Sequence, residues 1–228
     1  MGGAKALVFA KYPQAGQVKT RMAPPLTPEQ ASKLHLACLQ TVFERLSSIR
    51  AFDISLWVTP DEQASRLCSL LGLSEAQGRG QGGGDLGARL KRAAASALGG
   101  EAGAVVLFGA DSPTIPLAWL RRALRELEEH EAVLGPTEDG GYYLLGLRVH
   151  VPALFSGIAW GTSRVAEQTM QRAGAAGVDL VTLPTWYDVD RIEDLERARA
   201  DLETMDGAEG PAAQRLRGLL LELLDRWR

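Results

Sequence analysis

A short apolar run that ends beside a carboxylate most constrains the fold of this chain. The residues Val105-Val106-Leu107-Phe108 are followed directly by Gly109-Ala110-Asp111-Ser112-Pro113. An uninterrupted apolar run rich in Val and Phe is typical of a strand buried on both faces, as in a parallel sheet. Open α/β sheets bind their ligands at the carboxyl ends of such strands. Asp111 is therefore the first candidate functional residue.

Strand-like and helix-like patterns alternate along the rest of the chain. Strands are expected at 4–11, 54–59, 105–108, 132–134, 142–147 and 178–183, and helices at 27–49, 60–71, 86–98, 116–129, 162–172 and 192–205. The residues Thr27-Pro28-Glu29-Gln30 match a capping box with proline at the first helical position. The short connection between 132–134 and 142–147 predicts an antiparallel insertion. The pattern predicts an α/β fold with a mostly parallel central sheet.

Length and composition favour one domain. The chain has 228 residues, of which 46% are hydrophobic, and this suits a single α/β core. We expect that domain over residues 1–205. Residues 206–228 are expected to form a linker and a C-terminal helix packed on the same domain, because leucines recur there at helical spacing. That apolar stripe consists of Leu216, Leu219, Leu220, Leu223, Leu224 and Trp227.

Charge, cysteine content and hydropathy exclude several classes of protein. The net charge is −3, from 25 basic and 28 acidic residues, so we expect no nucleic-acid partner. Cys38 and Cys68 lack the paired spacing of a zinc site, which favours free thiols in a reducing compartment. The sequence shows neither a signal-peptide pattern nor a run long enough to span a bilayer. We therefore expect a cytoplasmic protein without membrane insertion.

Three cations and a glycine lie close to the end of the first expected strand. Gly16 permits an unusual turn, and Lys11, Lys19 and Arg21 could bind phosphate, the arginine through its bidentate fork. The loop is not a Walker A motif, because no partner glycine stands at the required spacing. The alternative is a solvated basic loop.

A glycine-rich loop spans residues 77–87. Its glycines, Gly84 among them, would let a nucleobase or ribose approach the backbone, with Asp85 and Arg89 nearby. The alternative is a flexible connection in which Asp85 is the N-cap of the next helix.

Three aspartates are candidate metal ligands. Asp111 could supply one oxygen ligand to Mg²⁺ or Mn²⁺, and Asp188 or Asp190 could supply the second after the last strand. Asp111 could instead form an Asx-turn. Asp190 also matches the start of a helix, since Glu193 follows three residues later. If Asp190 caps that helix, Asp188 remains as the ligand.

The segment Glu138-Asp139-Gly140-Gly141-Tyr142-Tyr143 could hold an acceptor, with Glu138 or Asp139 as general base. The alternative is an Asp-Gly hairpin turn. Trp160 could border a pocket or pack in the core. The three histidines share no ligand spacing and are predicted to bind no metal.

Motifs from most of the chain resemble one family. They are Phe9-Ala10-Lys11, Pro13, Gly16, Val18-Lys19-Thr20-Arg21, Gly84-Asp85-Leu86-Gly87, Arg89, Gly109-Ala110-Asp111-Ser112-Pro113, Leu134-Gly135-Pro136, Glu138-Asp139-Gly140-Gly141-Tyr142-Tyr143-Leu144, Trp160-Gly161-Thr162, Asp188-Val189-Asp190 and Glu193-Asp194-Leu195. This set resembles the DUF2064 family of bacterial GT-A-type glycosyltransferases. The resemblance implies a Rossmann-like αβα sandwich of GT-A type, a nucleotide bound by the amino-terminal half, including Ala10 and Lys11, and a divalent metal near Asp111.

The resemblance and the loops together predict a metal-dependent glycosyltransferase that uses a nucleotide-diphospho-sugar donor and a small-molecule acceptor. In that reaction the metal and the basic loop stabilise the leaving nucleoside diphosphate. Asp111-Ser112-Pro113 departs from the usual Asp-x-Asp motif, and the basic loop also resembles that of nucleotidyltransferases. A nucleotidyltransferase that releases pyrophosphate and a catalytically silent nucleotide-binding module stay open. The sequence leaves the base, sugar, acceptor, stereochemical outcome and oligomeric state undetermined.

Overall fold

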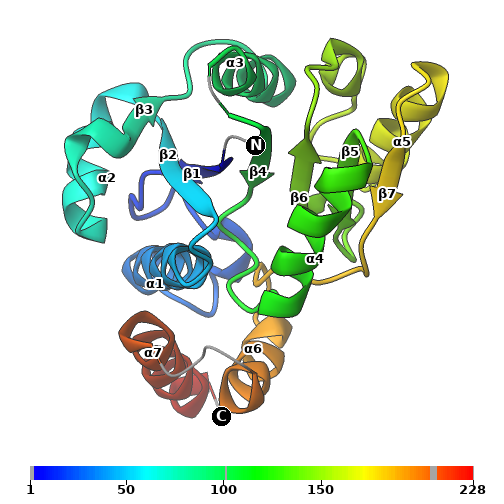
Figure 1. The fold of residues 1–228 in the computed structure, drawn as a ribbon. Helices are drawn as coiled ribbons and strands as arrows, with labels where there is room; N and C mark the ends of the chain where they lie inside the picture. The colour runs from blue at the N-terminus through cyan, green and yellow to red at the C-terminus, as the bar shows by residue number, and fades with distance from the viewer. Residues whose placement is uncertain (1–2, 101, 206–209, 228) are drawn as a thin grey trace.

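The computed structural model describes residues 3–100, 102–205 and 210–227. For residues 226 and 227 only the backbone is described. Its seven strands form one sheet in the order β3-β2-β1-β4-β6-β5-β7 (Figure 1). The strands are β1 (Ala4–Lys11), β2 (Phe52–Thr59), β3 (Gly78–Gly80), β4 (Ala104–Phe108), β5 (Ala132–Pro136), β6 (Tyr142–Leu147) and β7 (Leu180–Thr182). Strand β6 runs antiparallel to β4 and β5, whereas the other neighbours are parallel. The predicted α/β fold with an antiparallel insertion is confirmed.

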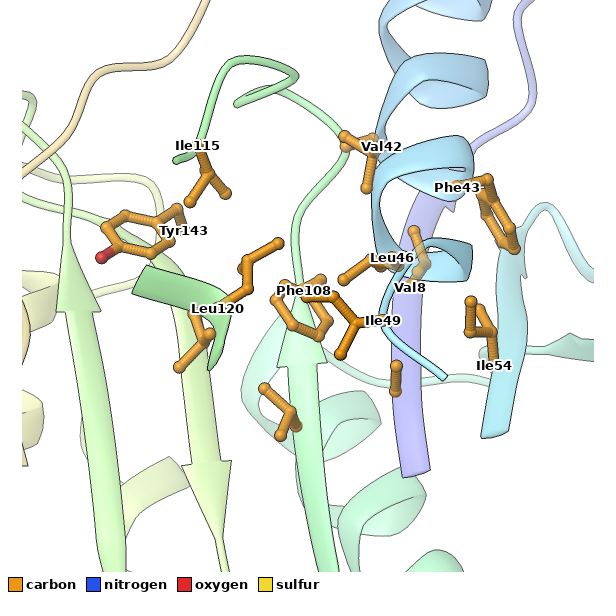
Figure 2. Close-up of a cluster of buried hydrophobic side chains, with 14 of the residues drawn as sticks. Val8, Val42, Phe43, Leu46, Ile49, Ile54, Phe108, Ile115, Leu120 and Tyr143 are labelled. Atoms are coloured by element: carbon orange, nitrogen blue, oxygen red, sulfur yellow. The ribbon is translucent and has the colours of Figure 1, made fainter. Parts of the chain in front are cut away.

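Helices cover both faces of the sheet. Helices α1 (Pro28–Ser47), α2 (Ala64–Leu71) and α4 (Leu117–Glu129) pack on one face, and α3 (Leu86–Leu98) and α5 (Val165–Ala175) pack on the other. Side chains alternate along β1, so Val8 faces α1 while Leu7 faces α3. Figure 2 shows the first core, where Phe108 of β4 packs toward Leu46 of α1.

A third layer lies beyond α1. Helices α6 (Glu193–Thr204) and α7 (Pro211–Trp227) lie beside α1 (Figure 1), and Leu216 and Leu220 of α7 are buried in one cluster with Leu34 and Cys38 of α1.

Both cysteines are free and buried. The expected linker covers residues 206–211, of which 206–209 lie outside the described residues, and α7 begins at Pro211, one residue earlier than expected. None of the described helices is long and apolar enough to cross a bilayer.

Glu44 of α1 joins α7 to the body of the protein. Its carboxylate accepts hydrogen bonds from the backbone N–H groups of Ala212 (2.8 Å) and Ala213 (3.0 Å), in the first turn of α7. A carboxylate at that position satisfies unpaired N–H groups and interacts favourably with the helix dipole. Glu44 therefore serves as an N-cap supplied by a distant helix.

We predict that Glu44→Ala lowers the free energy of unfolding by about 1–2 kcal/mol, the usual cost of losing a helix cap. Urea denaturation would measure the change. Glu129→Ala, which removes an exposed carboxylate from the end of α4, is the control and should cost far less. Equal losses in the two variants would contradict the capping role.

Short sequence patterns predicted most ends of the helices and strands, with two exceptions. The capping box is present: Thr27 Oγ1 accepts from the N–H of Gln30, whose side chain accepts from the N–H of Thr27. Residues 78–80, expected as loop, form the edge strand β3, which pairs in parallel with β2; a Cβ on Gly78 or Gly80 would clash with Cys68 or Asp61. Thr162 and Ser163 do not cap α5, which begins at Val165; the Thr162 hydroxyl donates to the Ala159 carbonyl.

Candidate functional site

A cavity of about 750 Å³ opens at the carboxyl ends of β1, β2 and β4. Lys11, Thr59 and Phe108, each the last residue of its strand, all line it. This is where open α/β sheets bind ligands, and the volume lies within the usual range of small-molecule sites. The cavity therefore lies where the apolar run before Asp111 predicted a ligand site.

Most of the predicted site residues line this cavity, although they come from distant parts of the chain. Those that line it are Ala10, Lys11, Lys19, Arg21, Arg89, Asp111, Asp139, Gly141, Tyr142, Trp160, Asp188 and Asp190. The cavity lining does not include Gly16, Gly84, Asp85, Glu138 or Gly140. Asp85 instead caps α3 by accepting from the N–H of Ala88 (2.8 Å), and Glu138 pairs with Arg197 of α6 (2.9 Å).

Lys19 lies at the centre of the charged part of the cavity. Its ammonium group donates to Oδ1 of Asp111 and to Oδ1 of Asp190, the latter at 2.8 Å. The Lys19 side chain is only 2% exposed, whereas that of Asp111 is 42% exposed. Arg21 approaches Asp190 from the open side at 3.8 Å and is 61% exposed. The cluster thus has one buried cation and one accessible cation.

The backbone of Lys19 is held in an unusual conformation. Among the described residues, Lys19 is the only one other than glycine with a positive φ, at φ 49° and ψ 36°. Val18 and Met22 are buried on either side of it. A left-handed lysine is strained unless its surroundings hold it, and such strain often occurs at functional sites.

Opposite charges outweigh burial in this cluster. Burial by itself would raise the pKa of Asp111, but Lys19 and then His35 hold that pKa below its usual range. Burial would likewise lower the pKa of Lys19, but the neighbouring acidic groups, Asp111 foremost, raise it instead. Both groups are therefore charged at neutral pH and form an ion pair in which the ammonium is buried and the carboxylate is open to the cavity.

His35 of α1 is a cavity residue that the sequence did not single out. Its Nε2 lies 3.0 Å from the carbonyl oxygen of Lys11, and its Nδ1 lies 3.9 Å from Oδ1 of Asp111. A carbonyl can only accept, so Nε2 carries the proton. Burial lowers the pKa of His35, which keeps the ring neutral. No local motif marks this residue, because its role depends on the packing of α1 under β1.

Asp188 shows the opposite behaviour to Asp111. Its Oδ1 accepts a hydrogen bond from the hydroxyl of Ser112. Burial, followed by the nearby carboxylate of Asp111, raises the pKa of Asp188 to about 7. Asp188 thus adds a second carboxylate next to Asp111, without an ammonium partner like that of Asp111.

We predict that Asp188 makes stability fall with rising pH. A folded-state pKa raised from 3.8 to about 7 means that the folded protein binds more protons than the unfolded chain between these values. The stabilisation is complete below about pH 4 and is lost as the pH rises through about 7. The Tm of wild type minus that of Asp188→Asn, measured from pH 4.5 to 8, should decrease across this range. The subtraction removes the contribution of His35, and a flat difference would refute the assignment.

Asp190 does not cap α6, contrary to the alternative considered for it. The N–H groups of Asp190 and Arg191 donate to Oδ2 of Asp194 at 2.9 Å and 2.6 Å. Asp194 therefore holds this turn, and the Asp190 carboxylate is directed to Lys19. Sequence spacing selected the wrong aspartate because both residues suit a helix start.

The turn between β5 and β6 combines both interpretations of its sequence. Oδ1 of Asp139 accepts from the Thr137 hydroxyl (2.6 Å) and from the N–H of Gly141 (3.0 Å), as in a side-chain-stabilised turn. Gly140 has φ +88°, and a Cβ there would lie 1.9 Å from the carbonyl oxygen of Ser163. Asp139 nevertheless lines the cavity, whereas Gly140 has a packing role.

Gln81 is a second buried cavity residue that was not predicted. Its side-chain NH₂ donates to the carbonyls of Trp57 (2.9 Å) and Ala10 (3.2 Å), and its oxygen accepts from Arg89 (3.4 Å). Gln81 thus links the ends of β1 and β2 to Arg89. It lies within the glycine-rich segment, where the glycines drew attention instead.

The chain matches the family described as uncharacterised proteins conserved in bacteria, DUF2064, over residues 41–162. A crystal structure from Desulfovibrio desulfuricans, of a proposed nucleotide-diphospho-sugar transferase, is 30% identical over 97% of this chain and 98% of that one, with a TM-score of 0.87. The chain belongs to the DUF2064 family. The comparison with curated proteins gave no match.

More distant structures share the fold. A cytidylyltransferase from Leptospira borgpetersenii has a TM-score of 0.60 at 15% identity, over 99% of this chain and 95% of that one. A 4-diphosphocytidyl-2C-methyl-D-erythritol synthase from Anaerococcus prevotii has a TM-score of 0.58 at 13% identity, over 89% and 99%. The predicted fold of GT-A type is confirmed.

Proposed function

We propose that this protein is a metal-dependent glycosyltransferase that uses a nucleotide-diphospho-sugar donor and a small-molecule acceptor. One observation carries the proposal: a single cavity joins the cations Lys11 and Arg21, the carboxylates Asp111 and Asp188, and the aromatic residue Trp160. Such a cavity can hold a diphosphate, a metal and a sugar at the same time. The family's similarity to a proposed nucleotide-diphospho-sugar transferase supports the same reaction class.

The cationic part of the cavity suits the nucleotide. We assign the phosphates to Lys11 and Arg21, which are exposed to the cavity, and to Arg89 on the β2 side. The nucleoside would lie against Ala10 and Gln81 at the ends of β1 and β2. Lys19 was also predicted to bind the nucleotide, but the structure gives its ammonium two carboxylate partners.

The carboxylates of the cavity suit a divalent metal. Among the residues that the structure describes, no three His, Cys, Asp or Glu side chains are grouped closely enough to bind a metal by themselves. Mg²⁺ and Mn²⁺, however, commonly use one or two carboxylates together with substrate phosphates and water. The N–H of Val189 donates to the carbonyl of Asp111 (2.8 Å) and the Ser112 hydroxyl donates to Asp188, so the loops that carry these two carboxylates lie side by side. A bound metal would neutralise charge on the leaving diphosphate.

The part of the cavity lined by Tyr142 and Trp160 suits the acceptor. The two rings contact each other edge to face, with ring centroids 6.3 Å apart, and Gly141 and Asp139 also line the cavity. The acceptor hydroxyl attacks the sugar carbon, and Asp139 is the cavity carboxylate assigned to take its proton. Glu138, the other candidate base, is paired with Arg197 outside the cavity lining.

Nucleotidyl transfer is the second candidate, and the cations favour it. The cavity is lined by three cationic side chains, Lys11, Arg21 and Arg89, in addition to Lys19, whose charge is paired with carboxylates. That is enough positive charge for a nucleoside triphosphate. In this reaction a phosphate on the second substrate attacks the α-phosphorus and pyrophosphate leaves.

Product analysis separates the two reactions. The protein would be incubated with Mg²⁺ or Mn²⁺ and panels of nucleoside triphosphates and UDP- or GDP-sugars. Release of a nucleoside diphosphate from a sugar donor supports glycosyl transfer. Pyrophosphate release from a triphosphate, with no nucleoside diphosphate from any donor, would overturn it. A silent binding module would show nucleotide-dependent thermal stabilisation without either product.

A further inference from the structure

We propose that Lys19 is an internal cation that holds Asp111 and Asp190 in place and weakens divalent-metal binding until substrate phosphates arrive. The inference rests on the proposed metal-dependent function. It assigns Lys19 a positioning role that differs from phosphate binding.

The contacts of Lys19 distinguish it from the other cations of the cavity. Its side chain is 2% exposed and its ammonium group donates to Asp111 and Asp190, whereas the Arg21 side chain is 61% exposed and Lys11 is also exposed. A phosphate could reach Arg21 or Lys11 directly. The Lys19 ammonium directs two of its three N–H donors to carboxylates, so it offers a phosphate one donor at most.

The backbone keeps Lys19 at this position. The residue is left-handed, and the buried side chains of Val18 and Met22 anchor the chain on either side. An ammonium group held in this way cannot easily withdraw when a metal approaches. Lys19 therefore stays beside Asp111 as a fixed positive charge, rather than exchanging with the metal.

A fixed ammonium next to Asp111 has a predictable effect on metal affinity. A divalent ion that binds Asp111 is attracted by Asp188 and repelled by Lys19 across a few ångströms, and the repulsion is only partly screened inside the cavity. The protein alone would then bind Mg²⁺ or Mn²⁺ weakly. A nucleotide supplies further oxygen ligands and negative charge, so the metal and the nucleotide would bind together.

Mn²⁺ binding to the Lys19→Gln variant, without substrate, tests this inference. We expect the variant to lose about 5 °C in Tm without metal, because the carboxylates of Asp111 and Asp190, 42% and 33% exposed, lose their ammonium partner. We expect Mn²⁺ to bind about tenfold more tightly than in wild type and to restore part of that loss. Calorimetric titration and thermal shift would measure the two effects. Lys11→Gln removes an equal charge from the same cavity and should change both quantities much less.

A second variant covers the case in which Lys19→Gln does not fold. Combining Lys19→Gln with Asp190→Asn keeps the local net charge unchanged and should return the Tm close to that of wild type. The double variant should bind Mn²⁺ about tenfold more tightly than Asp190→Asn alone, because these two variants differ only in the Lys19 charge. Mn²⁺ affinity in the double variant no higher than in Asp190→Asn, or in Lys19→Gln no higher than in Lys11→Gln, would overturn the inference. That result would leave the proposal of glycosyl transfer intact. If the variant binds Mn²⁺ more tightly but the wild-type protein shows no turnover, the proposed function is rejected and the role of Lys19 stands.

Discussion

The Asp111→Asn variant is expected to lose about 10³-fold in turnover while it keeps its fold. Asp111 lies at the carboxyl end of β4, faces the cavity with 42% of its side chain exposed, and pairs with the buried ammonium of Lys19. The amide would lose the charge that attracts a metal and would weaken the hold on Lys19. Both effects reduce the electrostatic stabilisation of a leaving phosphate group.

Turnover of whichever reaction the substrate panel identifies would be measured together with circular dichroism. Asp179→Asn is the matched control, because Asp179 is 60% exposed, pairs with His130 and lies outside the cavity lining. The control should keep its turnover. Substantial activity in Asp111→Asn, at wild-type metal and substrate concentrations, would remove Asp111 from the reaction.

The Gly140→Ala variant is expected to be the most strongly destabilised of the single substitutions outside the charged cluster. A Cβ at this position would lie 1.9 Å from the backbone oxygen of Ser163, and the residue has φ +88°. Both the turn and the segment before α5 would have to move. We expect a loss of at least about 3 kcal/mol, which corresponds to about 6 °C or more in Tm for a chain of this length.

Gly16→Ala separates the clash from the backbone strain. Gly16 has φ +78°, but a Cβ there would meet no atom within 4 Å. Its substitution should therefore cost only about 1 kcal/mol. The difference between the two variants in thermal unfolding measures the contact between Gly140 and Ser163. Equal losses would show that conformation alone, and not this contact, requires glycine at position 140.

The candidate site shows which functional residues short sequence patterns can predict. The apolar run before Asp111 located the strand end, and the cations after β1 identified Lys19 and Arg21 as cavity residues. Asp190 and Asp111 were both predicted as metal ligands, and both accept hydrogen bonds from Lys19. The alternative that Asp190 caps α6 was wrong, since Asp194 holds that turn. Helix-start signals identify a type of residue, and two aspartates four positions apart fulfil them equally.

The sequence by itself determined the features that depend on short-range interactions. Apolar patterns predicted the helices and the strands other than β3. The capping box at Thr27 and Gln30 joins residues three apart, so the sequence displays it directly. Tertiary structure decided which charges meet. Lys19 is separated by 92 residues from Asp111 and by 171 from Asp190, and His35 reaches the site only because α1 packs against β1. Burial and long-range pairing set the charge state and the role of these groups, and neither is encoded in spacing along the chain.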